Sequence, residues 1–209
     1  ATKYFSSLPK GNAISEREKV VNSPYVGSLL IDNRTLKEPN FIKVCMGFEV
    51  GGWTSPLLVT MCVMQQLLGG GSSFSAGGPG KGMYTRLYTQ VLCKYSWAEG
   101  VEAFTAASTG RGLLGIDTLC PPDYIGNAVM MVVDQFTTLV KERVTDEELS
   151  RAKNMLKSLM MMNLESRIIT CEDIARQYIT YGHRKRPDIL CDEIDKVTAQ
   201  DIVNVAKIM

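Results

Sequence analysis

The feature that most constrains this 209-residue chain is a glycine-rich segment at residues 69–82, GGGSSFSAGGPGKG, which holds seven of its 18 glycines. Glycine lacks a Cβ atom and samples both signs of φ, so the residues of this segment favour no single conformation by themselves. Apolar, helix-like runs flank it at residues 56–68 and 83–92. A loop of this length inside a compact domain is usually functional or disordered. A plain linker has no need of the apolar Phe74 or the stiffening Pro79, so we expect a functional loop.

The glycine patterns of the chain do not fit a phosphate-binding loop. A P-loop needs a first glycine, four residues, and then Gly-Lys-Ser/Thr. Here Ser75 stands at the first glycine position, and Gly82 stands where the metal-binding hydroxyl belongs. A second pattern, at Gly110, Gly112 and Gly115, is followed by residues typical of a strand, whereas a dinucleotide site requires a helix there. We interpret it as a glycine-rich hairpin and predict that the chain binds no nucleotide.

The composition is that of an ordinary globular domain, with 45% apolar and 22% charged residues. A formal net charge of +1 gives no sign of a nucleic-acid or membrane-surface partner, so we expect no nucleic acid to bind. The longest apolar run, residues 155–162, is interrupted by Lys157 and Ser158 and is too short to cross a bilayer. The opening residues carry no targeting signal, as we expect of a processed or partial chain.

The six cysteines form no CxxC pair, and several of them have apolar neighbours. This pattern favours reduced core residues over a disulfide framework or a metal site, and it implies a reducing compartment. The six are Cys45, Cys62, Cys93, Cys120, Cys171 and Cys191.

The first part of the chain is polar, and we interpret residues 1–24 as an interdomain linker segment. Residues 25–209 are predicted to form one domain. Its strands are expected from alternating or apolar runs at residues 25–31, 41–49, 97–108 and 113–120, with a turn at 109–112. Ser55 and Pro56 are predicted to begin the helix before the glycine-rich segment, as its N-cap and first-turn proline.

The rest of the chain is predicted to be helical. Thr145 and Glu148 form a capping-box pattern that opens one helix, and Thr198 opens a last short one. The other helices are expected at residues 56–68, 83–92, 124–143, 171–181 and 187–194. Strands that come first and helices that come later predict an α+β fold, a mostly antiparallel sheet with helices packed on one face.

The stretch LLGGGSSFSAGGPGKGMYTRLYTQVL closely resembles the glycine-rich loop of the α subunits of mitochondrial processing peptidase. MMMNLESR at residues 160–167 and EDIARQ at residues 172–177 support the same resemblance. These α subunits are non-catalytic members of the pitrilysin-type M16 metallopeptidase family, which also contains the core proteins of the cytochrome bc1 complex. The resemblance runs over the whole chain but covers only the C-terminal half of such a subunit. It implies an M16-type half-domain, with the N-terminal half-domain absent from this chain.

The resemblance also implies a role for the loop. In this family a β subunit carries the zinc site, and the loop of the α subunit helps to recognise basic, amphipathic presequences and to present them for cleavage. A glycine-rich loop suits that work, because it can contact many peptides without demanding one sequence. The implied presequence-binding residues are Gly69, Gly70, Gly71, Ser72, Ser73, Phe74, Ser75, Ala76, Gly77, Gly78, Pro79, Gly80, Lys81 and Gly82. The implied partners are the β subunit and presequence peptides, and Lys81 is given no charge role because it would repel a basic peptide.

Zinc chemistry is not expected on this chain itself. The proteolytic members of the family bind zinc through His-x-x-Glu-His on a helix, and this chain has one histidine, His183. A Ser or Cys nucleophile would need the same histidine as its base, and no GxSxG motif occurs. We interpret His183 as a residue at a helix C-terminus. We predict no cofactor and no catalysis on this chain, with zinc on the β partner.

Two further features leave alternatives open. The basic cluster at residues 184–186 binds an acidic partner or lipid headgroups, or it satisfies the carbonyls at a helix end, and the second interpretation is favoured. The run at residues 155–164 has more methionine and leucine than one helix stripe requires. This excess predicts an exposed apolar face that another domain or subunit covers.

The resemblance is compatible with two functions. The first is that of the non-catalytic α subunit of the processing peptidase, and the retained loop favours it. The second is that of a structural core protein of the bc1 complex, with other subunits of that complex as partners. One polypeptide can serve both purposes. Either function implies the mitochondrial matrix or the matrix side of the inner membrane.

Overall fold

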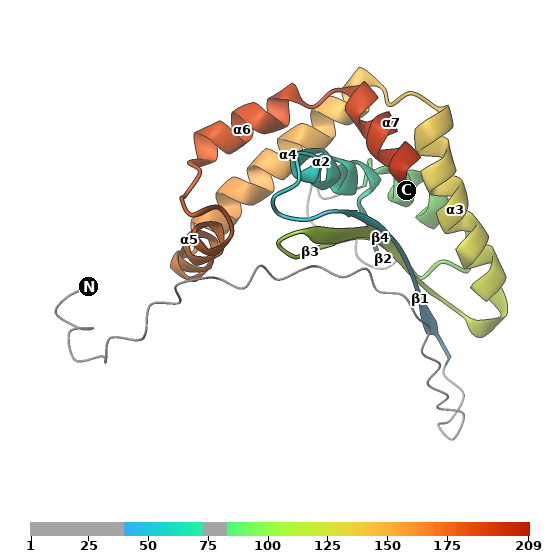
Figure 1. Ribbon diagram of the computed structural model, residues 1–209. Helices are drawn as coiled ribbons and strands as arrows, with labels where there is room; N and C mark the ends of the chain where they lie inside the picture. The colour runs from blue at the N-terminus through green and yellow to red at the C-terminus, as the bar shows by residue number, and fades with distance from the viewer. Residues whose placement is uncertain (1–39, 73–82) are drawn as a thin grey trace. The chain divides into compact units, whose positions relative to one another are not determined.

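The computed structural model describes residues 40–72 and 83–209. The predicted linker at residues 1–24 and the predicted strand at residues 25–31 lie outside the described residues, as does most of the glycine-rich segment. The described part consists of one antiparallel sheet with helices on one side of it (Figure 1). This is an α+β fold, as the sequence predicts.

Within the described residues the sheet has four strands in the order β1-β4-β3-β2, and each pair of neighbours is antiparallel. The strands are Ile42–Gly51 (β1), Gly70–Ser72 (β2), Gly100–Ala107 (β3) and Arg111–Cys120 (β4). Three predicted strands are therefore confirmed as β1, β3 and β4, with small shifts at their ends. β3 and β4 form the predicted hairpin, so Gly112 and Gly115 lie in a strand and do not open a helix.

Strand residues alternate between the two faces of the sheet, and one face forms the core. In the register of β1 and β4, Met46 lies opposite Ile116 and Phe48 lies opposite Leu114. On the other side of β4, Ala103 of β3 also lies opposite Ile116. Three strands therefore present apolar side chains to the same layer, which the helices cover.

The helices lie over this core face (Figure 1). They are Leu58–Leu68 (α2), Ile125–Lys141 (α3), Asp146–Leu164 (α4), Arg167–Tyr181 (α5), Pro187–Lys196 (α6) and Ala199–Ile208 (α7), with a short π-helix at Tyr88–Leu92 and a 3₁₀ turn at Pro122–Tyr124. Side chains from α2, α3 and α7 are fully buried in one cluster with the strand residues, among them Met61, Leu68, Val132, Leu139 and Ile202. The predicted packing of helices on one face of the sheet is confirmed.

Two predicted helix starts are confirmed by their capping hydrogen bonds. Thr145 caps α4 and Thr198 caps α7, each through the reciprocal hydrogen bonds of a capping box. The predicted start of α2 is wrong, since the helix begins at Leu58 with Leu57 as its N-cap. Ser55 still contributes, because its Oγ accepts a hydrogen bond from the Leu57 N–H at 3.2 Å.

Helix α5 begins at Arg167, earlier than predicted, and several of its apolar side chains are exposed. Its only buried residue is Gln177, whereas Ile168 is 81% exposed and Tyr178 is 58% exposed. Met162, near the end of α4, is also exposed. The predicted exposed apolar face is therefore confirmed and extends onto α5. What covers this face stays a prediction.

The prediction that the cysteines are core residues is wrong for three of the six, and Cys62 and Cys191 are half-buried. Cys120 is buried, but Cys45, Cys93 and Cys171 are exposed, and all six cysteines are free thiols. Cys45 shows the reason. Its neighbours in β1 point into the core, so the alternation of the strand turns Cys45 outward.

Candidate functional site

The glycine-rich segment begins as regular structure and not as a loop. Gly69 ends α2 as its C-cap, and Gly70–Ser72 form β2, which pairs with β3. The expectation of a loop from Gly69 onward is therefore wrong, because pairing with a distant strand orders the first residues. The other ten predicted site residues, 73–82, lie outside the described residues. A role of the segment in binding presequences stays a prediction.

Close packing requires glycine at the first two positions of the segment. The φ angle is +59° at Gly69 and +117° at Gly70, conformations that residues with side chains rarely adopt. A Cβ atom on Gly69 would lie 2.3 Å from Cγ2 of Thr85. One on Gly70 would lie 2.0 Å from the carbonyl oxygen of Val101. The chain passes from α2 into β2 by this path because both side chains are absent.

The start of the segment contacts Thr85, which lies three residues after the segment. The backbone N–H of Gly70 donates a hydrogen bond to Oγ1 of Thr85 at 3.2 Å, across 15 positions of sequence. The carbonyl of Gly69 accepts a hydrogen bond from the N–H of Ala103 at 2.8 Å, which fixes the entrance to the sheet. Thr85 is buried, so its contact with Gly70 is shielded from water. The base of the segment is thus held in one arrangement.

The exit of the segment is anchored in the core. The predicted helix at residues 83–92 is shorter than expected: residues 86–92 are helical, and Tyr88–Leu92 form a π-helix. The N–H of Cys93 bonds to the carbonyl five residues earlier at 3.0 Å, the spacing of a π turn. Leu87 and Val91 are fully buried, so this short stretch packs firmly against the domain.

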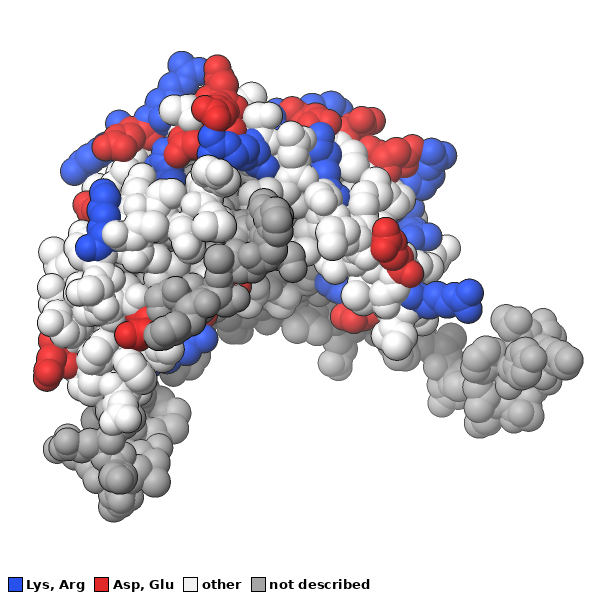
Figure 2. Space-filling view, turned by 180° about the vertical axis from the view of Figure 1, so that it is seen from behind, with Lys and Arg blue, Asp and Glu red and all other residues white. Residues whose placement is uncertain are grey.

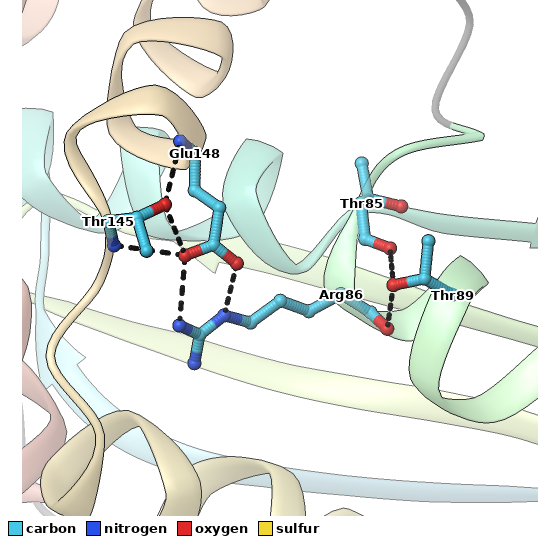
Figure 3. A network of polar contacts seen from close by, with 5 residues as sticks. All are labelled: Thr85, Arg86, Thr89, Thr145 and Glu148. Atoms are coloured by element: carbon cyan, nitrogen blue, oxygen red, sulfur yellow. Dashed lines mark hydrogen bonds and ion pairs between the residues drawn. The ribbon is translucent and has the colours of Figure 1, made fainter.

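Arg86 connects the exit of the segment to the start of α4 (Figure 3). Its side chain is 6% exposed, and its guanidinium donates two hydrogen bonds to the carboxylate of Glu148, from Nε to Oε1 at 3.1 Å and from Nη2 to Oε2 at 3.2 Å. Glu148 is also the acidic member of the α4 capping box and accepts a hydrogen bond from the N–H of Thr145 at 3.0 Å. Nη1 of Arg86 is buried and has no hydrogen-bond acceptor in the described part of the chain.

Hydrogen bonding favours the ionised form of Glu148. Burial is the largest single influence and raises the pKa of the carboxyl group, but hydrogen bonds from Arg86 and Thr145 act together against it. The net result is a pKa below 4.5, the ordinary value for this group. The sequence patterns did not point to this ion pair. The available signal was Arg86 itself, the one charged residue in the run at residues 83–92.

A cleft of about 780 Å³, which the sequence did not predict, lies between the β1–α2 connection and helices α5 to α7. The hydroxyl of Tyr181 donates to the carbonyl of Trp53 at 2.7 Å across one end of it. Gln177 donates to the carboxylate of Asp173 and accepts from the backbone N–H of Lys185 at 2.6 Å. The bond between Tyr181 and Trp53 ties α5 to the β1–α2 connection, and Gln177 holds the residues that follow α5 against the helix.

The basic cluster at residues 184–186 lies beside this cleft, and its favoured interpretation is wrong. Lys185 pairs with Glu193 at 2.9 Å, and Arg186 pairs with Asp188. Both acids belong to α6, so carboxylates of the next helix, and not carbonyls at a helix end, take up these charges. On the face that Figure 2 shows, Lys and Arg side chains are interspersed with Asp and Glu.

His183 follows Gly182, the left-handed C-cap of α5, as predicted for a residue at a helix C-terminus. It is exposed, and its Nδ1 lies 3.1 Å from the carbonyl oxygen of Tyr181. Within residues 40–72 and 83–209, no group of three or more His, Cys, Asp or Glu side chains is placed to hold a metal ion. No helix in the same residues has the length and apolar character to cross a membrane.

An antiparallel sheet covered on one face by helices, with a glycine-rich segment between two apolar helical stretches, is the arrangement expected of an M16-type half-domain. Comparison with known families agrees. The chain belongs to the family described as Peptidase M16 inactive domain, which matches residues 1–156.

The relatives include subunits of one peptidase from plant and animal. "Mitochondrial-processing peptidase subunit alpha" of Solanum tuberosum is 40% identical over 210 residues, covering 99% of this chain and 40% of that protein. The protein of the same name from Homo sapiens is 36% identical over 171 residues, covering 82% of this chain and 32% of that protein. This chain therefore spans less than half the length of these relatives.

A solved structure shares the fold. A chain of "Complex III2 from Candida albicans, Inz-5 bound" aligns with a TM-score of 0.72, covering 81% of this chain and 40% of that chain. The sequence identity is 18%, so this likeness establishes the fold alone.

Proposed function

We propose that this chain is part of a non-catalytic α subunit of a mitochondrial processing peptidase. In this role its glycine-rich segment helps to recognise presequences and to present them to a zinc-bearing β subunit. The observation that carries the proposal is the match to subunits of that name, at 40% and 36% identity. Membership of an inactive M16 domain family supports the non-catalytic part. The corresponding location is the mitochondrion, in the matrix or on the matrix side of the inner membrane.

The base of the glycine-rich segment supports a working role for it. Gly70, at its start, is bonded to Thr85, just after it, and the side chain of Arg86 anchors the chain that follows. Binding groups in proteins are commonly carried by a connecting segment that a rigid scaffold positions. Because Gly69 and Gly70 are packed against their neighbours, we propose that residues 71–82 make the contacts with the peptide.

Reconstitution tests this proposal. The complete α subunit that contains this chain is purified, mixed with a β subunit, and given a fluorescent presequence peptide. We expect cleavage only when both subunits are present, and we expect zinc, measured after dialysis, to accompany the β subunit. One zinc per copy of this chain, or chelator-sensitive cleavage by this chain alone, would contradict the proposal.

The alternative is a structural subunit of the bc1 complex. The likeness to a chain of Complex III2 does not favour it, because at 18% identity that likeness concerns the fold alone. Purification of the natural protein separates the two functions. Recovery with a soluble β partner supports the processing role, and recovery only with haem-containing membrane subunits supports the structural role.

A further inference from the structure

We infer that the ion pair of Arg86 and Glu148 is a positioning element for the glycine-rich segment. It anchors the chain just after the segment and thereby sets how tightly a presequence is held. This inference rests on the proposed function. The two side chains act through the segment and are not themselves assigned to contact the peptide.

The location of the pair carries the first part of the inference. Arg86 directly follows Thr85, whose hydroxyl accepts the N–H of Gly70 at the base of the segment. Glu148 is 62 positions further along the chain, in the first turn of the 19-residue helix α4. The exit of the segment is thus attached to the N-terminus of a long helix and not only to its neighbours in sequence.

A contribution to stability alone is a weak explanation for the pair. Removing an arginine side chain from water is costly, and a buried ion pair recovers that cost only when its hydrogen bonding is complete. Here Nη1 of Arg86 is buried and meets no acceptor among the described residues. Apolar residues of similar volume at such a position are often as stable. What the planar guanidinium group contributes is a fixed geometry, because its two parallel N–H groups bind a carboxylate in one orientation.

Helix α4 makes a second contact next to Thr85, with the preceding residue Tyr84. Tyr84 is 71% exposed, and the guanidinium carbon of Arg151 lies 5.3 Å from the centroid of its ring. Arg151 lies one turn after Glu148 on α4 and also pairs with Glu147. Helix α4 therefore contacts the chain at Tyr84 and at Arg86, the residues on either side of the threonine that closes the base.

Conservative substitutions separate the effect of the two-point hydrogen-bond geometry from the effect of the charge. Arg86→Lys keeps the positive charge but loses the two-point fork. Glu148→Gln keeps a capping-box side chain at the third helical position but loses the charge. Each should raise KM for a presequence about tenfold and leave kcat within about twofold, because the segment is less well placed to hold the peptide and the catalytic groups are untouched.

The test uses the complete α subunit assembled with its β partner, and a fluorescent presequence peptide is the probe. Steady-state cleavage gives KM and kcat for the wild type, Arg86→Lys and Glu148→Gln. Asp146→Asn is the matched control, because it removes an exposed acid from the first turn of the same helix and leaves both Glu148 and the Glu147–Arg151 pair in place. Arg151→Gln, at a partly exposed position, weakens the contact with Tyr84 without disturbing the core and should also raise KM. An unchanged KM in folded Arg86→Lys, Glu148→Gln and Arg151→Gln would overturn the inference.

A subunit that lacks residues 73–80 distinguishes failure of this inference from failure of the proposed function. If the deletion leaves KM unchanged, the segment does not bind presequences and the proposed function fails. If the deletion raises KM but Arg86→Lys does not, the proposed function stands and the positioning role is wrong. When the two changes are combined, Arg86→Lys should have no further effect on KM, because no segment remains to be positioned. An additional rise in the combined variant would indicate a merely structural role.

Discussion

The hydroxyl of Tyr181 donates a 2.7 Å hydrogen bond to the backbone carbonyl of Trp53, 128 positions earlier in the chain. The indole N–H of Trp53 donates in turn to the carbonyl of Ala107 at 2.8 Å, so the acceptor of the Tyr181 bond is itself held by β3. Because Gln177 is the only buried residue of α5, polar contacts of this kind, more than apolar packing, hold the helix to the domain.

Tyr181→Phe should lower the free energy of unfolding by about 1 kcal/mol, because the Trp53 carbonyl loses its hydrogen-bond partner in a partly buried position. Urea denaturation followed by circular dichroism measures the change. Tyr178→Phe is the matched control, since this tyrosine lies on the same helix and is 58% exposed. If the two variants were equally stable, the bond between Tyr181 and Trp53 would contribute nothing measurable to folding.

Glu148 should make the domain sensitive to acid. The pKa of its carboxyl group is lowered by folding from the ordinary value of 4.5. The folded state therefore favours the charged form, so this contribution is fully present above pH 4.5 and is lost as the pH falls through the lowered pKa. Between neutral pH and about pH 3, the thermal midpoint of Glu148→Gln should fall less steeply with decreasing pH than that of the wild type. Glu147→Gln controls for loss of a charge on the same helix, and an equally steep fall in Glu148→Gln would refute the prediction.

The thiols should differ strongly in reactivity. Cys45, Cys93 and Cys171 are exposed, whereas Cys120 is fully buried, and burial raises the pKa of its thiol and so lowers the reactive thiolate fraction. Labelling of the native protein with a disulfide reagent, followed by peptide mapping, should modify the three exposed residues first. Rapid labelling of Cys120 in the folded protein would be incompatible with the register that places it in the core.

The apolar face at the end of α4 and on α5 should make this chain associate at high concentration, because exposed apolar patches drive association. Met162 is 58% exposed and Ile168 is 81% exposed, so Met162→Lys combined with Ile168→Glu should reduce association without unfolding the domain. Met130→Lys, at a residue of α3 that is 69% exposed, is the control. Sedimentation velocity over a range of concentrations measures the effect. A wild-type chain that stays monomeric throughout would argue against an unpartnered face.

The parts of the fold that depend on neighbouring residues were predictable from the sequence. The alternation in β1 and the capping boxes at Thr145 and Thr198 each involve residues only a few positions apart, and the structure confirms them. The prediction that Cys45 is a core residue failed, because it relied on the apolar residues next to it in the sequence. In a strand, adjacent residues point to opposite faces, so apolar neighbours in the core place Cys45 on the outer face.

The sequence singles out the glycine-rich segment as a candidate site, but it does not reveal the contacts that hold the segment in place. Composition identified residues 69–82, but the pairing of Gly70–Ser72 with β3 depends on a strand about thirty positions later. The ion pair of Arg86 and Glu148 joins residues 62 positions apart. No local pattern encodes such a contact, because it arises only when the tertiary fold brings the two segments together.

The most direct test of the central claim is the affinity of the assembled subunits for a labelled presequence peptide, measured by fluorescence anisotropy with and without residues 73–80 of this chain. Shortening a loop changes its closure entropy by about 1 kcal/mol or less, so the thermal midpoint of the subunit and its assembly with the β partner should be nearly unchanged. We expect the Kd for the peptide to rise by at least about tenfold in the shortened subunit. A shortened subunit that assembles normally and binds the peptide with the wild-type Kd would contradict the proposed role of the glycine-rich segment.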